Sequence, residues 1–108
     1  MKPKLSEHAI QKQILDWLKI KDIFHWRNNS GAMGGTRKGK RWFMRFGAVG
    51  SPDIFAVVDG KIYGIEVKSK GNKMSDNQVI FSIGLQNSGG IYVLAYKLED
   101  VTDVLTRL

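Results

Sequence analysis

Residues 52–68 read PDIFAVVDGKIYGIEVK, and the two central strands of the fold can be predicted from this stretch. Two runs rich in β-branched and aromatic residues, Ile54–Val58 and Lys61–Val67, are separated by the dipeptide Asp59-Gly60. Asp-Gly between two such runs is the strongest short-range signal for a β-hairpin, because both residues tolerate the positive φ that a tight turn needs. The sequence therefore predicts a hairpin with a two-residue turn.

The two-residue turn fixes which residues of the hairpin lie opposite each other. Val58 would face Lys61, and the pairing continues outward one residue at a time until Asp53 lies opposite Glu66. Directly opposed residues have Cβ atoms about 4.5–5.5 Å apart on one face of the sheet. Lys68 projects from the same face as Glu66, because side chains alternate along a strand. Two carboxylates and an ammonium group are therefore expected to converge at the open end of the hairpin.

This combination of side chains suits a metal site. Two neighbouring carboxylates repel, so one keeps its proton unless a cation lies between them. Mg²⁺ or Mn²⁺ fits an all-oxygen site, to which the carbonyl of Val67 could contribute. The metal would activate a water molecule, and Lys68 could orient that water, deprotonate it or neutralise charge on a phosphate. The residues thus predict phosphodiester hydrolysis.

A purely structural interpretation of the same residues is also open. Asp53 could be a turn residue, and Glu66 and Lys68 could form an exposed pair on a strand. However, Glu66 lies between Ile65 and Val67 in a run that otherwise looks buried. A buried carboxylate needs a partner or a metal, which favours the site.

The remaining elements are predicted on either side of the hairpin. Upstream, the pattern predicts an amphipathic helix over Leu5–Ile20 and a short strand over Phe24–Arg27. Residues 31–50 carry six glycines and are expected to be mostly loop, with an extended stretch over Arg41–Phe46. Downstream we expect a helix over Ser75–Ser88 with Val79, Ile80, Ile83 and Leu85 inward, a strand over Ile91–Tyr96 parallel to Lys61–Val67, and a helix over Glu99–Leu105. The order predicts one domain over residues 1–108, an α/β fold with a mixed sheet and flanking helices.

Composition excludes several classes of protein. The 108 residues are 43% hydrophobic, which suffices for a packed core, and the chain has no cysteine for a disulfide or a thiolate zinc site. No apolar run approaches the roughly 20 residues of a membrane helix, and the N-terminus lacks a signal-peptide pattern. We therefore expect no membrane partner and a cytoplasmic location, in a bacterium or, for a virus-encoded protein, in the host cell.

Positive charge is concentrated in the glycine-rich segment. The net charge is +7, and no acidic residue lies between Asp22 and Asp53. Such clustering favours binding to a polyanion, although a solvated basic surface is the alternative. Trp42 and Phe43 could stack on an unpaired base or pack in the core, and the glycines would allow a mobile loop that orders on DNA. The candidate phosphate contacts are Arg27, Ser30, Arg37, Lys38, Lys40, Arg41, Arg45, Lys70 and Lys73.

Pro52-Asp53, followed after twelve intervening residues by Glu66-Val67-Lys68, resembles the PD-(D/E)xK nuclease superfamily. Further residues sharpen the resemblance: Glu7 lies in the first helix and Gln78 in the helix after the hairpin. The arrangement, from about Ser6 to Tyr96, is similar to the VRR-NUC branch, particularly its stand-alone virus-type members.

The resemblance implies a restriction-endonuclease-like α-β-β-β-α-β core and Mg²⁺- or Mn²⁺-dependent hydrolysis of DNA. It assigns metal binding to Glu7, Asp53, Glu66 and the Val67 carbonyl, catalysis to Lys68, and organisation of the site to Gln78. Stand-alone members are similar to Holliday-junction resolvases and tend to be homodimers. We therefore expect a structure-specific endonuclease acting on branched DNA. The alternatives are a fork, flap or nicking nuclease of the same family, a non-catalytic DNA-binding module, and a small basic RNA-binding protein.

Two of these residues have competing structural roles. Glu7 shares a helical stripe with Ile10 and Ile14 and should point inward, but it could simply be a favourable carboxylate in a first helical turn. Gln78 completes an S-x-x-Q capping box with Ser75, so it could serve the helix, the site or both.

Overall fold

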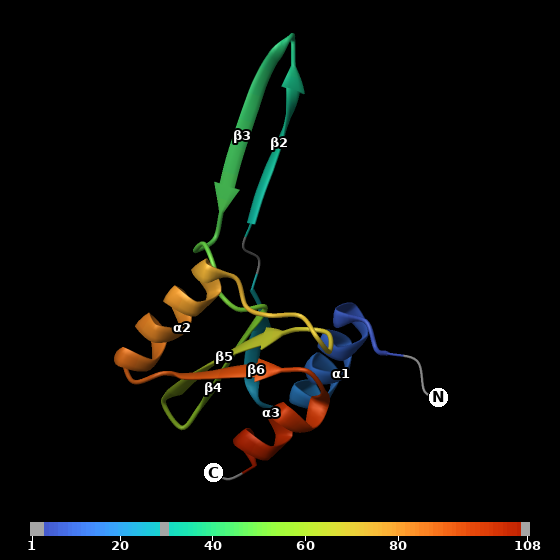
Figure 1. The fold of residues 1–108 in the computed structure, drawn as a ribbon. Coiled ribbons are helices and arrows are strands. Elements are labelled where there is room, and N and C mark those ends of the chain that lie inside the picture. The colour runs from blue at the N-terminus through green and yellow to red at the C-terminus, as the bar shows by residue number, and fades with distance from the viewer. Residues whose placement is uncertain (1–3, 29–30, 107–108) are drawn as a thin grey trace.

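The computed structural model describes residues 4–28 and 31–106, with the backbone alone described at residues 31–33 and 45–46. Three helices surround a sheet, from which a long hairpin projects (Figure 1). None of the helices in these two ranges is long and apolar enough to cross a membrane. The elements in chain order are α1 (Glu7–Ile20), β1 (Phe24–Arg27), β2 (Gly31–Arg37), β3 (Lys40–Phe46), β4 (Ile54–Val58), β5 (Lys61–Val67), α2 (Asp76–Asn87), β6 (Ile91–Ala95) and α3 (Leu98–Leu105).

The main sheet has the strand order β1-β4-β5-β6 and is mixed. Strand β4 pairs antiparallel with β1 and β5, whereas β5 and β6 run parallel. The α/β class predicted from the sequence is confirmed, and α1-β1-β4-β5-α2-β6 follows the expected order of elements. The predicted hairpin register is also confirmed: Val58 pairs with Lys61 and Ile54 with Ile65. Asp59 has a φ of 50°, which the tight turn requires.

The hydrophobic core lies on the face of the sheet that α1 and α3 cover. Helix α1 is capped at its N-terminus by Ser6, whose hydroxyl accepts a hydrogen bond from the amide of Ala9. Burial of its apolar stripe fixes α1 against the sheet, each fully buried side chain contributing about 1.5–3 kcal/mol. The buried core consists of Ile10, Ile14, Leu18, Ile54, Ala56, Tyr63, Ile65, Val67, Val93, Ala95, Val101 and Leu105.

Helix α2 covers the opposite face, and here the expected inward residues were largely wrong. Ile80 and Ile83 are exposed, as is Val79, whereas Ser82 is buried and Leu85 is half-buried. The helix has apolar residues on both sides, so the helical period alone does not identify the buried one. The close approach of α2 to the sheet identifies the buried side of the helix, because a Cβ on Gly64 of β5 would lie 2.9 Å from Cδ2 of Leu85.

Most of the loop expected over residues 31–50 is instead a hairpin of two seven-residue strands, β2 and β3, whereas the extended stretch expected over Arg41–Phe46 is confirmed as part of β3. We call this hairpin, residues 31–46, the arm; it extends away from the main sheet (Figure 1). Its turn is formed by Lys38 and Gly39, which both have positive φ. Gly34 and Gly35 pair directly with Phe43 and Trp42. Aromatic side chains opposite glycines restore the strand stability that glycine lacks.

Candidate active site

Asp53 lies immediately before β4, where its backbone is fixed from the end of β1. The amide of Asn28 donates to the carbonyl of Asp53 at 2.7 Å. The side-chain Nδ2 of Asn28 donates to Ser51 Oγ at 2.8 Å and to the Pro52 carbonyl at 3.0 Å. Asn28 therefore holds the whole turn that presents Asp53. Sequence reasoning missed this role, because an asparagine after a strand is most simply interpreted as a turn residue.

The Asp53 carboxylate reaches across to the end of β5. Its Oδ2 accepts a hydrogen bond from the amide of Val67 at 2.8 Å. This contact places the carboxylate beside Glu66, as expected from the hairpin register, and leaves the other carboxylate oxygen available. It also places the Val67 backbone at the site.

Among the described residues, Glu66 is the one acidic or basic side chain that is buried. It is only 4% exposed. Its Oε1 accepts a hydrogen bond from Gln78 Nε2 at 2.9 Å. Its Oε2 is buried and has no hydrogen-bond partner among the residues that the structure describes. A buried carboxylate oxygen without a partner costs free energy, so this atom identifies a place where a positive ligand would be stabilising.

The electrostatics of the pair agree with that conclusion. Burial, the Asp53 carboxylate and, more weakly, Glu7 raise the pKa of Glu66 to about 8, although the Lys68 ammonium opposes the shift. The pKa of Asp53 is also raised, chiefly by burial and then by Glu7, although its hydrogen bond with the Val67 amide and the Lys68 and Arg27 cations lower it. Lys68 therefore offsets part of the carboxylate charge, and the site still favours a further cation.

Gln78 serves both of the roles considered from the sequence. The capping box is confirmed: Ser75 Oγ accepts from the Gln78 amide at 3.2 Å, and Gln78 Oε1 accepts from the Ser75 amide at 2.9 Å. Because the Ser75 amide can only donate, Oε1 must face it, and Nε2 is directed at Glu66. The start of α2 thereby fixes the orientation of the Glu66 carboxylate.

Glu7 lies beside the site, but it does not point inward as expected. It is the first residue of α1, one turn before the buried stripe, and is exposed. Its Oε1 accepts from the Ser69 amide at 3.2 Å and from Asn72 Nδ2 at 3.3 Å, both in the loop after β5. No group of three or more His, Asp or Glu side chains in the described ranges is arranged to hold a metal ion. Glu7 would have to turn from this loop to join Asp53 and Glu66.

Tyr92 is a residue beside the site that sequence reasoning did not identify. It pairs with Gly64 across the parallel ladder, and Glu66 lies two residues further along on the same face. Its buried Oη has no hydrogen-bond partner in the described structure. Burial, followed by the charges of Glu66 and Asp53, raises the pKa of its phenol. Only the strand register, which the sequence did not supply for β6, brings this residue to the site.

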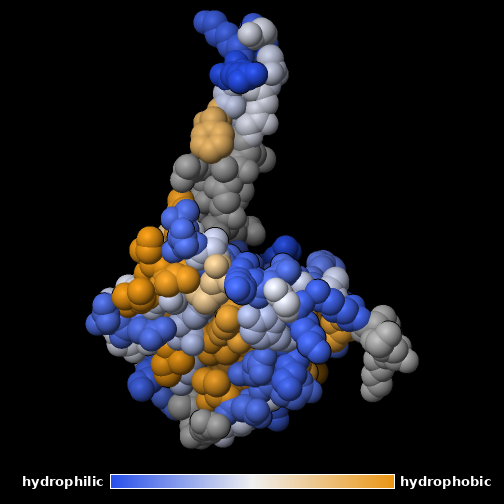
Figure 2. Space-filling view, in the orientation of Figure 1, coloured by the Kyte–Doolittle hydropathy of each residue, from blue (hydrophilic) through white to orange (hydrophobic). Residues whose placement is uncertain are grey.

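The predicted phosphate contacts fall into two groups. Arg27, Lys70 and Lys73 are exposed on segments that adjoin the site. The second group occupies the far end of the arm, where Figure 2 shows hydrophilic side chains: Arg37, Lys38, Lys40 and Arg41. Ser30 and the side chain of Arg45 lie outside the described residues. Trp42 and Phe43 are 41% and 65% exposed, which excludes the core-packing interpretation of these aromatics.

Comparison with protein-family models found no match, and comparison with curated proteins found none either.

Proposed function

We propose that this protein is a metal-dependent DNA endonuclease of the PD-(D/E)xK type, acting on branched DNA. The observation that carries the proposal is the pair of carboxylates at the open end of the β4–β5 hairpin. Asp53 and Glu66 lie together there, with Lys68 close enough to influence both. The buried Glu66 Oε2 has no partner among the described residues.

The donor set fits a hard divalent cation such as Mg²⁺ or Mn²⁺. Asp53 and Glu66 would hold the ion, with the Val67 carbonyl and Glu7 as further oxygen ligands. A bound cation supplies Lewis-acid activation of the phosphate and lowers the pKa of a water molecule. It would also offset the burial and the repulsion from neighbouring carboxylates that together raise the pKa of Asp53 and of Glu66.

The chain prepares these ligands through fixed hydrogen bonds. The Val67 amide orients Asp53 by binding Oδ2, and Gln78 orients Glu66 by binding Oε1. Each carboxylate thus keeps one oxygen for a ligand. Such supporting contacts typically change metal affinity or activity 10–100-fold. Lys68 places an ammonium beside the carboxylates, where it can orient the attacking water or neutralise charge on the scissile phosphate.

The partners are assigned from surface chemistry. The basic residues around the site and on the arm supply contacts to DNA phosphates, and this binding should weaken steeply with salt. The exposed apolar residues Val79, Ile80 and Ile83 on α2 are the surface that we assign to a second copy of the chain.

A DNA-binding module without catalysis is the second candidate function, which the basic arm favours. Binding alone gives no reason to bury Glu66 beside Asp53.

A cleavage assay tests the proposal directly. Purified protein is incubated with four-way, forked, flapped and linear DNA of matched sequence in Mg²⁺, Mn²⁺ or EDTA. We expect cleavage in either metal, none in EDTA, and at least about tenfold faster cleavage of branched than of linear DNA. Failure to cut any substrate would contradict the enzyme assignment and leave the DNA-binding module. Equal rates on linear and branched DNA would contradict the substrate preference alone.

The dual role of Gln78 gives a prediction with a matched control. Gln78→Met loses both its capping contact and the donor to Glu66, whereas Ser75→Ala loses only the cap. We expect Gln78→Met to reduce the cleavage rate about 10–100-fold. Ser75→Ala should lower the free energy of unfolding by about 1 kcal/mol and leave the cleavage rate within about twofold. Equal losses of activity in the two variants would mean that Gln78 acts only through the helix.

A further inference from the structure

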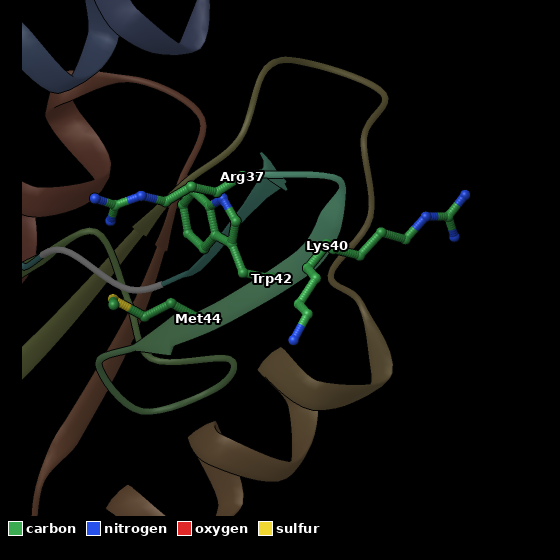
Figure 3. A pocket seen from close by; sticks show the side chains of 5 residues that line it. Arg37, Lys40, Trp42 and Met44 are labelled. Carbon is green, nitrogen blue, oxygen red and sulfur yellow. The ribbon is translucent and has the colours of Figure 1, made fainter.

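The arm carries an aromatic residue in a basic setting. Arg37, Lys40, Arg41, Trp42 and Met44 line a shallow hollow of about 450 Å³ on its surface. Figure 3 shows the indole of Trp42 between the Arg37 side chain and the strand that carries Lys40 and Met44. The proposed cleavage chemistry at Asp53 and Glu66 does not use this hollow.

The backbone of the arm itself supports the position of Trp42. Gly35 pairs directly with Trp42, and a Cβ on Gly35 would lie 3.1 Å from the indole Nε1 and 3.3 Å from Cε2. The indole therefore lies against the backbone of the neighbouring strand, where a larger residue would push it away. With 41% of its surface exposed, Trp42 is both supported and accessible. A rigid, exposed aromatic ring is suited to stacking.

We propose that the arm binds an unpaired nucleotide of the DNA substrate, with the base stacked on Trp42 and the neighbouring phosphates held by Arg37 and Lys40, which share its face of the hairpin. Charge complementarity identifies the ligand class, because no acidic residue occurs between Asp22 and Asp53. Base stacking on an aromatic side chain discriminates against duplex DNA, whose bases already stack on each other. The assignment to DNA rests on the proposed function, whereas the stacking site rests on the arm.

The position of Trp42 sets a distance from the cut. The end of β1 is joined to Asp53 through Asn28, so the arm leaves the main sheet next to the proposed site. Strands rise about 3.4 Å per residue, so Trp42 lies roughly 14 Å along β3 from Phe46. Each strand of duplex DNA also rises about 3.4 Å per nucleotide. Where duplex DNA spans this distance, the stacked base is therefore expected at least about four nucleotides from the scissile phosphate.

The test measures binding without cleavage. The Asp53→Asn variant in EDTA is titrated with a labelled duplex and with the same duplex carrying a single-stranded gap. We expect tighter binding of the gapped DNA, and a loss of about tenfold in that affinity when Trp42→Ala is added, while duplex affinity stays within about twofold. Trp42→Phe should retain most of the preference, because phenylalanine keeps an aromatic face. Phe24→Ala, at an exposed aromatic of β1, is the matched control and should change neither affinity.

Several outcomes would overturn the inference. These are equal loss of duplex and gapped affinity in Trp42→Ala, an unchanged preference in that variant, or the same loss in Phe24→Ala. Tighter binding of an RNA oligonucleotide of the same sequence would overturn the assignment to DNA. Placing 2-aminopurine at successive positions locates the stacked base by its quenching, which Trp42→Ala should abolish. A protein that binds gapped DNA in this way but cuts no substrate would retain the stacking site and defeat the proposed function.

Discussion

Replacing Asp53 by Asn is expected to reduce DNA cleavage by about 10²–10³-fold while the protein stays folded. The asparagine side-chain oxygen can still accept the hydrogen bond from the Val67 amide, which Asp53 Oδ2 accepts at 2.8 Å in the wild type. What the substitution removes is the negative charge that would hold a divalent cation. It also relieves the repulsion with Glu66, so we expect no loss of stability. Single-turnover cleavage of branched DNA at saturating metal measures the effect.

The same hairpin supplies the control. Asp59→Asn makes the identical chemical change at the exposed turn, and Asn-Gly is as favourable a turn as Asp-Gly. We expect its cleavage rate to equal that of the wild type. Wild-type activity in Asp53→Asn would show that the site is assigned to the wrong residue. A comparable loss in both variants would mean that the hairpin, and not the carboxylate, is responsible.

Glu66→Gln is expected to make the metal-free protein more stable, because it replaces a buried carboxylate by a neutral amide. The pKa of Glu66 is about 8 in the folded protein and its ordinary value is 4.5. Folding therefore takes up a proton between these values, and the wild type loses stability as the pH rises through this window. The advantage of Glu66→Gln should be small near pH 4.5, grow towards pH 8 and then level off. Thermal unfolding in EDTA across this pH range measures it.

Bound metal should reverse the difference in stability, so that the wild type becomes more stable than Glu66→Gln. A ligand at 100 times its Kd adds about 2.7 kcal/mol of stability, and each kcal/mol raises the Tm of a domain of this size by roughly 4–8 °C. Saturating Mg²⁺ or Mn²⁺ is therefore expected to raise the wild-type Tm by about 10 °C or more, with little change in Glu66→Gln. Glu99→Gln, at an exposed position of α3, should respond to metal as the wild type does. An equal shift in Glu66→Gln would mean that the ion binds elsewhere.

The part of the site that lies within one hairpin could be predicted from the sequence. Asp59-Gly60 determines a register, and the register places Asp53 beside Glu66 without any knowledge of the rest of the fold. The same local logic identified the capping box of Ser75 and Gln78. In each case the residues are close in sequence, so local turn or helix geometry is sufficient.

Contacts between distant segments could not be predicted in this way. Asn28 and Tyr92 reach the site only after β1 and β6 have been placed on either side of the hairpin. Strand β2 of the arm was misinterpreted as a loop because Gly34 and Gly35 weaken a strand when each is considered alone. Only their pairing with Phe43 and Trp42 shows how the arm is stabilised.

The arm also exposes strand edges through which molecules of this protein could associate. In the described part of the chain, β2 and β3 pair only with each other, so each strand leaves one edge of backbone donors and acceptors unpaired. Such edges are templates for a strand from another molecule. The cations Arg37, Lys38, Lys40 and Arg41 give neighbouring arms the same charge and oppose their association. Neutralising them to weaken the proposed DNA binding would therefore also remove the charge repulsion between neighbouring arms.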